Sequence, residues 1–161
     1  MGAVKNMVRG FIYSGIYAVV TIVIPLLTFT WLWNMVVEGF PLSFEQQEYQ
    51  NVIFWVTAFG LIITGCAFFT HSSPKQSIRK AVFALIQVLV NCLYIWSYKF
   101  SGATNIGFII TDPLMGFIAL NIQQMVLIYM GIYFLTIVIK VYDIFDFTIN
   151  REKIREDRMK A

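Results

Sequence analysis

The chain has 161 residues, of which 58% are hydrophobic and only 13% are charged. Soluble domains carry roughly 25% charged residues, so this composition excludes an ordinary water-soluble domain. The net charge of +3 is small, and it gives no reason to expect a nucleic-acid partner.

Four stretches of the sequence contain no Asp, Glu, Lys, Arg or His, and they cover residues 10–37, 49–70, 81–98 and 113–139. Their lengths are 28, 22, 18 and 27 residues, whereas a bilayer core requires about 20 apolar residues per helix. Each stretch is therefore near or above the spanning length. The sequence predicts an all-α integral membrane protein, a four-transmembrane-helix up-down bundle that occupies the lipid bilayer.

The first helix is expected over residues 5–37. Its apolar stretch is longer than the apolar region of a cleaved signal peptide, which has roughly 7–15 residues. We therefore expect this helix to be retained in the mature protein. Pro25 near its middle removes one backbone hydrogen bond and predicts a kink. Gly10, Ser14 and Ala18 recur at i,i+4 spacing and predict a packing face, either within the bundle or between subunits.

The second and third helices are each predicted from a capping pattern. The segment SFEQ that begins at Ser43 has the spacing of a capping box, and it predicts a helix over residues 44–70. Ser73 followed by Pro74 predicts a third helix over residues 74–99, with the proline at the first helical position.

The fourth helix is expected over residues 113–140, because Asp112 and Pro113 form a third start signal. An extension along the inner membrane surface would carry the transmembrane domain, residues 1–149, to its end. Residues 150–161 would then form a short charged cytoplasmic tail.

The basic residues predict the orientation in the membrane. Eleven of the 12 Lys and Arg residues lie in the N-terminal segment, in the link between the second and third helices, or after the fourth helix. Lys99 alone lies on the other side. The positive-inside rule therefore predicts that both termini are cytoplasmic, and we expect the protein in the plasma membrane.

Two features belong to the predicted outer side. The four tryptophans lie near outer helix ends and predict an interfacial aromatic belt, with an aromatic ligand platform as the alternative; they are Trp31, Trp33, Trp55 and Trp96. The apolar stretch Ile106–Ile110 lies between the third and fourth helices, and it is either an ordinary outer loop, which we favour, or a segment that dips into the interface.

No charged residue lies in a predicted membrane core, which disfavours a proton-coupled carrier. Uncharged amides remain: Gln87 and Asn91 share one face of the third helix, and Asn121 and Gln124 share one face of the fourth. Measured from the outer ends of their helices, Asn91 and Asn121 both lie about 10 Å deep, and Gln87 and Gln124 both lie about 15–16 Å deep. These equal depths predict that Asn91 pairs with Asn121 and that Gln87 pairs with Gln124. The amides are either interhelical hydrogen bonds or the wall of a polar pathway.

The sequence offers few residues for catalysis or metal binding. His71, Cys66 and Cys92 are too few for a bis-histidine haem or a zinc site. There is no CxxC pair and no nucleotide-phosphate motif. We therefore predict no catalytic residues, no cofactor and no metal.

Two functions agree with these features, and an enzyme is the least favoured class. The leading hypothesis is a small non-enzymatic subunit, or an accessory or assembly component, of a larger membrane complex with other membrane protein subunits. The alternative is an oligomeric passive pore, or a lipid- or solute-handling protein, lined by the uncharged amides of the third and fourth helices.

Overall fold

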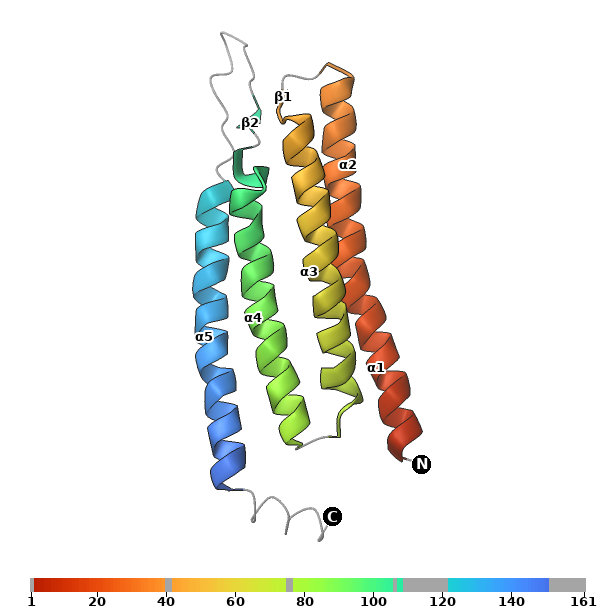
Figure 1. The fold of residues 1–161 in the computed structure, drawn as a ribbon, viewed down its shortest axis with the longest axis vertical. Helices are drawn as coiled ribbons and strands as arrows, with labels where there is room; N and C mark the ends of the chain where they lie inside the picture. Colours follow the sequence, from red (N-terminus) through yellow and green to blue (C-terminus); the bar gives the residue numbers. More distant parts are fainter. Residues whose placement is uncertain (1, 40–41, 75–76, 106, 109–121, 151–161) are drawn as a thin grey trace.

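The computed structural model describes residues 2–39, 42–74, 77–105, 107–108 and 122–150, and these are almost entirely helical (Figure 1). The elements in chain order are α1 (Gly2–Ala18), the π-helical segment η1 (Val19–Val23), α2 (Ile24–Val37), β1 (Leu42–Ser43), α3 (Gln46–Ser72), α4 (Ile78–Phe100), the 3-10 turn η2 (Ala103–Asn105), β2 (Gly107–Phe108) and α5 (Ile122–Ile149). Because α1, η1 and α2 follow one another without a break, we call them together the N-terminal helix.

The described residues contain four helices that are long and apolar enough to cross a membrane. They are Val4–Val37, Gln46–Ser72, Ile78–Phe100 and Gln123–Ile149. The all-helical fold with four candidate spans, predicted from the charge-free stretches, is therefore confirmed.

The helices pack in chain order. The N-terminal helix packs against α3, α3 against α4, and α4 against α5. Figure 1 shows them antiparallel and side by side, with the N-terminal helix and α5 at opposite edges. The described ends of the chain lie at one end of this bundle, which we call the terminal end. The opposite end, where α3 begins and α4 finishes, is the loop end.

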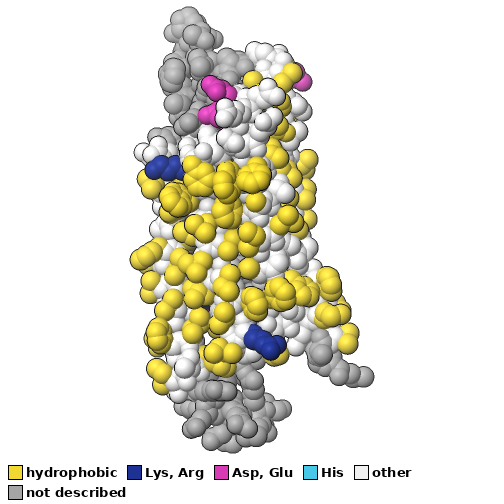
Figure 2. Space-filling view, viewed as in Figure 1, with side chains coloured by type: hydrophobic (Ala, Val, Ile, Leu, Met, Phe, Trp, Pro, Cys, Tyr) yellow, Lys and Arg dark blue, Asp and Glu magenta, His cyan; other side chains and the backbone are white. Residues whose placement is uncertain are grey.

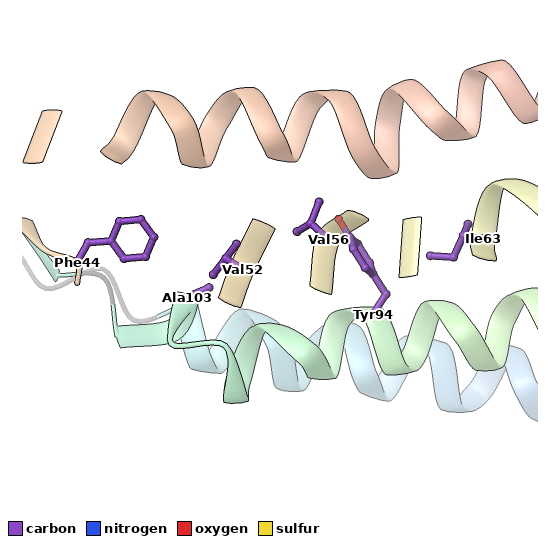
Figure 3. Close-up of a cluster of buried hydrophobic side chains, with 6 residues drawn as sticks. All are labelled: Phe44, Val52, Val56, Ile63, Tyr94 and Ala103. Carbon is purple, nitrogen blue, oxygen red and sulfur yellow. The ribbon is translucent and has the colours of Figure 1, made fainter. Parts of the chain in front are cut away.

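The buried core follows the side of α3 that faces its two neighbours. Val52, Val56 and Ile63 of α3 are each at most 1% exposed. Figure 3 shows their side chains between the N-terminal helix and α4, together with Tyr94 and Phe44. The core therefore lies toward the middle and the loop end of the bundle.

Charged side chains gather toward the two ends of the molecule, and hydrophobic side chains cover the face between them (Figure 2). The described charged residues at the terminal end are Lys5, Arg9, Arg79, Lys80, Lys140, Asp143 and Asp146, and those at the loop end are Glu38, Glu45, Glu48 and Lys99. An apolar band between two polar ends is the surface that a bilayer requires.

The second helix begins two residues later than its capping pattern predicted. α3 starts at Gln46 with Glu45 as its N-cap, and the Glu48 carboxylate accepts a hydrogen bond from the Glu45 backbone N–H at 3.1 Å. Ser43 instead lies in β1, where it pairs with Gly107 of β2. Strand pairing thus holds Ser43 in an extended conformation, and the next capping pattern starts the helix.

The third helix also begins later than predicted. Ser73 ends α3 instead of starting α4, since its hydroxyl donates to the Phe69 carbonyl oxygen at 2.6 Å. The N-cap of α4 is Ser77, whose hydroxyl oxygen accepts from the Lys80 backbone N–H at 3.3 Å. The predicted start of the fourth helix at Pro113 lies outside the described residues.

Candidate functional site in the helical interior

Four polar side chains occupy one face of α4 and turn toward the interior. Gln87, Asn91, Tyr94 and Tyr98 follow one another at helical spacing, so they share this face. Gln87 is 5% exposed and Tyr94 is 7% exposed, while Asn91 and Tyr98 are half-buried. We call these four residues the α4 polar face.

Pro25 explains how this face is joined to the N-terminal helix. A proline has no N–H, so the carbonyl oxygen of Thr21, four residues earlier, loses its usual helical donor. The hydroxyl of Tyr94 donates to this oxygen at 3.0 Å. The chain accommodates the proline with the wide turn of η1, an arrangement that often occurs at functional positions.

A second tyrosine extends this connection toward the loop end. The Tyr98 hydroxyl donates to the Tyr94 hydroxyl oxygen at 2.7 Å, and the two ring centroids are 5.2 Å apart. The three groups form a continuous hydrogen-bonded chain from Tyr98 through Tyr94 to the Thr21 carbonyl. In an interior of low dielectric constant, such a chain rigidifies the helices that it joins.

Gly60 of α3 packs against the other side of η1, opposite the hydrogen-bonded connection of Tyr98, Tyr94 and Thr21, which we call the tyrosine joint. A Cβ atom at Gly60 would lie 3.1 Å from the Thr21 carbonyl oxygen and would collide with the side chain of Ile22. The absence of a side chain therefore allows α3 to approach η1 closely. The wide turn is held between α3 and α4.

Aromatic side chains pack together among the described residues of the loop end. Trp33 stacks on Tyr49 with ring centroids 5.2 Å apart, and Phe44 packs edge-on against both rings at 6.2 Å. The hydroxyls of Thr30 and Tyr49 are 3.2 Å apart and share a hydrogen bond. Phe29 connects this cluster to the α4 polar face, since its ring centroid is 6.4 Å from that of Phe44 and 5.8 Å from that of Tyr98.

At the terminal end an aromatic stack is formed around the single histidine. Tyr13 stacks on His71 with ring centroids 3.9 Å apart, and the Arg9 guanidinium lies 5.6 Å from the centre of the Tyr13 ring. Nδ1 of His71 is buried and has no hydrogen-bond partner in the part of the chain that the structure describes. The stack packs the start of α1 against the end of α3.

The structure places two of the predicted amides in different surroundings. Gln87 of α4 is 5% exposed, whereas Gln124 of α5 lies on the exposed surface. Their pairing stays a prediction. Asn121 lies outside the described residues, and its pairing with Asn91 stays a prediction.

The predicted packing face of the first helix lies against α3. A Cβ atom at Gly10 would be 3.1 Å from the Phe68 carbonyl oxygen, and the Ser14 hydroxyl donates to the Thr64 carbonyl oxygen at 3.2 Å. Ala18 is half-buried at the end of α1. In the monomer, Gly10 and Ser14 therefore serve contacts between α1 and α3.

The four predicted belt tryptophans fall into two groups. Trp31 and Trp96 are exposed, at 59% and 47%. Trp33 and Trp55 are half-buried, and Trp55 stacks on Phe59 with ring centroids 5.5 Å apart. Trp31 and Trp96 thus expose more of their side chains than Trp33 and Trp55 do, and the interfacial belt stays a prediction.

The described ranges contain no group of three or more His, Cys, Asp or Glu residues that is placed to hold a metal ion. Cys66 is buried and Cys92 is half-buried, and both are free thiols. The interior chemistry of the described helices is therefore that of tyrosine hydroxyls, amides and backbone carbonyls.

Sequence reasoning missed the connection between Tyr94 and Thr21. Pro25 was a usable signal, because every proline inside a helix leaves a carbonyl oxygen four residues earlier without its donor. The sequence does not reveal which side chain from another helix will supply the missing hydrogen.

These features define a class: a small helical protein with four apolar helices of membrane-spanning length and an interior joint of tyrosines around a π-helical turn. Comparison with family models, curated proteins and solved structures gives no match to this chain.

Proposed function

We propose that the protein is a non-enzymatic subunit or accessory component of a larger assembly in the plasma membrane, with its terminal end in the cytoplasm. The observation that carries this proposal is the exposure of α5. In its most apolar window only 6% of the residues are buried, compared with 33% for α3.

The exposed surface of α5 includes polar groups as well as aliphatic ones. Tyr129 is 50% exposed, and Gln124 is also exposed. A hydroxyl or amide that faces hydrocarbon without a partner is costly, and neighbouring helices are its usual partners in membrane proteins. The surface of α5 therefore suits contact with another protein helix.

The proposed orientation is supported by charge. Among the described residues, Lys5, Arg9, Arg79, Lys80 and Lys140 lie at the terminal end, and Lys99 is the basic residue of the loop end. Cytoplasmic segments of membrane proteins carry such an excess of Lys and Arg.

A photo-crosslinking amino acid at Leu135 of α5 tests the subunit proposal, with the same replacement at Leu61 of α3 as the matched control. The two leucines are 65% and 60% exposed. Irradiation of native membranes should give a discrete protein adduct from position 135 and lipid adducts alone from position 61. Lipid adducts alone at both positions would exclude a stable partner on α5.

A second function is favoured by one observation on the α4 polar face. Gln87 is 5% exposed and shares this face with Asn91, Tyr94 and Tyr98. Amides and hydroxyls on one interior face are groups that water or a polar solute can bind, as in a pore or a solute-handling protein. In a Cys66→Ser, Cys92→Ser background, rapid reaction of Gln87→Cys with a small methanethiosulfonate reagent would support this function, and an unreactive thiol would support the subunit.

A further inference from the structure

A pocket of about 370 Å³ lies at the terminal end, between the first turns of α4 and the last turns of α5. Ser77 and Lys80 line it from α4, while Lys140, Asp143 and Asp146 line it from α5. The α4 polar face lies farther toward the middle of the bundle. The function proposed above does not require this pocket.

The inner wall of the pocket is apolar. Ala81 and Ala84 contribute short side chains from α4, and Phe147 contributes a ring from α5. Lys80 and Lys140 directly flank the charge-free stretches of their helices. The pocket therefore lies where the hydrocarbon of a bilayer would meet its headgroups, with Ala81 and Ala84 on the hydrocarbon side and Phe147 toward the terminal end.

The charges in the pocket are only partly compensated. Lys140 forms an ion pair with Asp143, with Nζ and Oδ2 2.9 Å apart. Asp146 accepts a hydrogen bond from the side-chain amide of Asn150 at 2.7 Å. In the described part of the molecule, Lys80 and Asp146 belong to no ion pair. One cation and one anion thus line the same pocket without neutralising each other.

The electrostatics of the first turn of α4 favour a bound anion in this pocket. This turn contains Lys80, which lines the pocket, and no acidic residue. The start of a helix carries a partial positive charge, so cations there are unfavourable and a bound anion is favourable.

We propose that this pocket binds the headgroup of a phospholipid that carries both a phosphate and a primary amine. The phosphate binds Lys80 and the Ser77 hydroxyl, the ammonium group binds Asp146, and the start of the acyl region packs against Ala81 and Ala84. A zwitterionic headgroup matches a pocket that contains two Lys and two Asp residues and has no net charge.

Native mass spectrometry of the full-length protein tests the assignment. The protein, in mild detergent micelles, receives equal concentrations of dioleoyl phosphatidylethanolamine or dioleoyl phosphatidylglycerol. Wild type should bind the first ethanolamine lipid about tenfold more tightly, the contribution of roughly one charge-assisted hydrogen bond. Equal binding of the two lipids would overturn the proposed role of the amine.

Two substitutions and one control locate the site. Lys80→Gln should weaken binding of the ethanolamine lipid about tenfold, and Asp146→Asn should make the two lipids nearly equivalent. Arg79→Gln removes the same charge from the adjacent exposed position, which does not line the pocket, and should change binding less than about twofold. Equal losses in Lys80→Gln and Arg79→Gln would overturn the site, as would no loss in either.

Soluble glycerophosphoethanolamine distinguishes a lipid from a free phosphate ester. It carries the same phosphate and amine but lacks acyl chains, so at millimolar concentration it should leave the lipid bound. Displacement of the lipid by this compound would show that the pocket recognises a soluble ligand, and it would overturn the proposed lipid. The melting temperatures of the lipid-free variants confirm that each remains folded.

Discussion

The helix that begins at the loop end and the helix that begins at the terminal end differ in the charge of their first turns. At the loop end α3 begins with Glu45 and Glu48, whose carboxylates lie beside the positive start of the helix. At the terminal end α4 begins with Ser77 and continues with two basic residues, Arg79 and Lys80. One helix start is neutralised by its own chain, and the other is left cationic.

The side chains that pack at the two ends also differ in size. Aromatic rings around Phe44 and Tyr49 fill the loop end, and Phe44 is 4% exposed. At the terminal end the small residues Ala81 and Ala84 face a pocket. The first turn of α3 thus contains its own carboxylate, whereas the first turn of α4 contains none and borders a pocket in which an external anion fits.

The largest expected contrast between the ends is in their accessibility. Glu45→Cys and Arg79→Cys, each in a Cys66→Ser, Cys92→Ser background, place single thiols at exposed positions of the loop end and the terminal end. Since the proposed orientation places the loop end outside, an impermeant maleimide should label position 45 in intact cells, and position 79 only after lysis. Labelling of position 79 alone in intact cells would reverse the orientation.

A glycine substitution should open the loop end. Gly102 has a φ of 89°, and a Cβ atom there would lie 2.6 Å from Cγ of Glu48. Gly102→Ala should therefore displace the Glu48 carboxylate from the start of α3. Overpacking costs about 1–3 kcal/mol, and loss of the cap adds about 1 kcal/mol. The free energy of unfolding, measured by SDS titration from mild detergent micelles, reports the loss.

Gly39→Ala is the matched control for Gly102→Ala. Gly39 has a φ of 90° and no atom within 4 Å of its ideal Cβ position. Both substitutions therefore carry the same backbone strain, but only the one at position 102 disturbs Glu48. Equal losses of stability would show that the Glu48 carboxylate contributes nothing to the loop end.

Between the two ends, the tyrosine joint should respond to loss of a single hydroxyl. Tyr94→Phe leaves the Thr21 carbonyl oxygen without the donor that replaces Pro25, and a buried acceptor left in this way costs about 1–3 kcal/mol. Tyr98→Phe leaves the bond from Tyr94 to Thr21 intact and should cost less, about 1 kcal/mol. The same SDS titration compares them, and a larger loss for Tyr98→Phe would contradict the assigned order.

The sequence predicts the spans well and the ends of the helices poorly, for a physical reason. Charge-free stretches are local and reflect the solvent around each helix, so they identify all four candidate spans. The start of α3 depends instead on a contact between distant segments, since pairing of Ser43 with Gly107 removes that serine from the cap.

The candidate site was predictable only in part, for the same reason. The face that holds Gln87 and Asn91 follows from helical periodicity. The partners of that face depend on how far α4 and α5 slide past each other, which the sequence does not fix. The predicted depth of Gln124 was counted from Leu114, which lies outside the described residues.

The smallest expected effect tests the electrostatic difference directly. Arg79 is exposed in the first turn of α4 and lies outside the pocket. Arg79→Glu gives this helix an acidic first turn, as Glu48 does for α3. A carboxylate at a helix start stabilises by about 0.3–1 kcal/mol, so the variant should unfold at a higher SDS fraction than wild type in phospholipid-free micelles.

The size and salt dependence of this gain separate a dipole effect from a change in side-chain packing. Arg79→Gln removes only the unfavourable cation and should give about half of the stabilisation, and added salt should reduce the gain of both variants, because exposed charges are screened. A stabilisation by Arg79→Glu that salt leaves unchanged would point to packing. A loss of stability would show that Arg79 already has a favourable role at the terminal end, and that the two helix starts do not differ in the way their charges indicate.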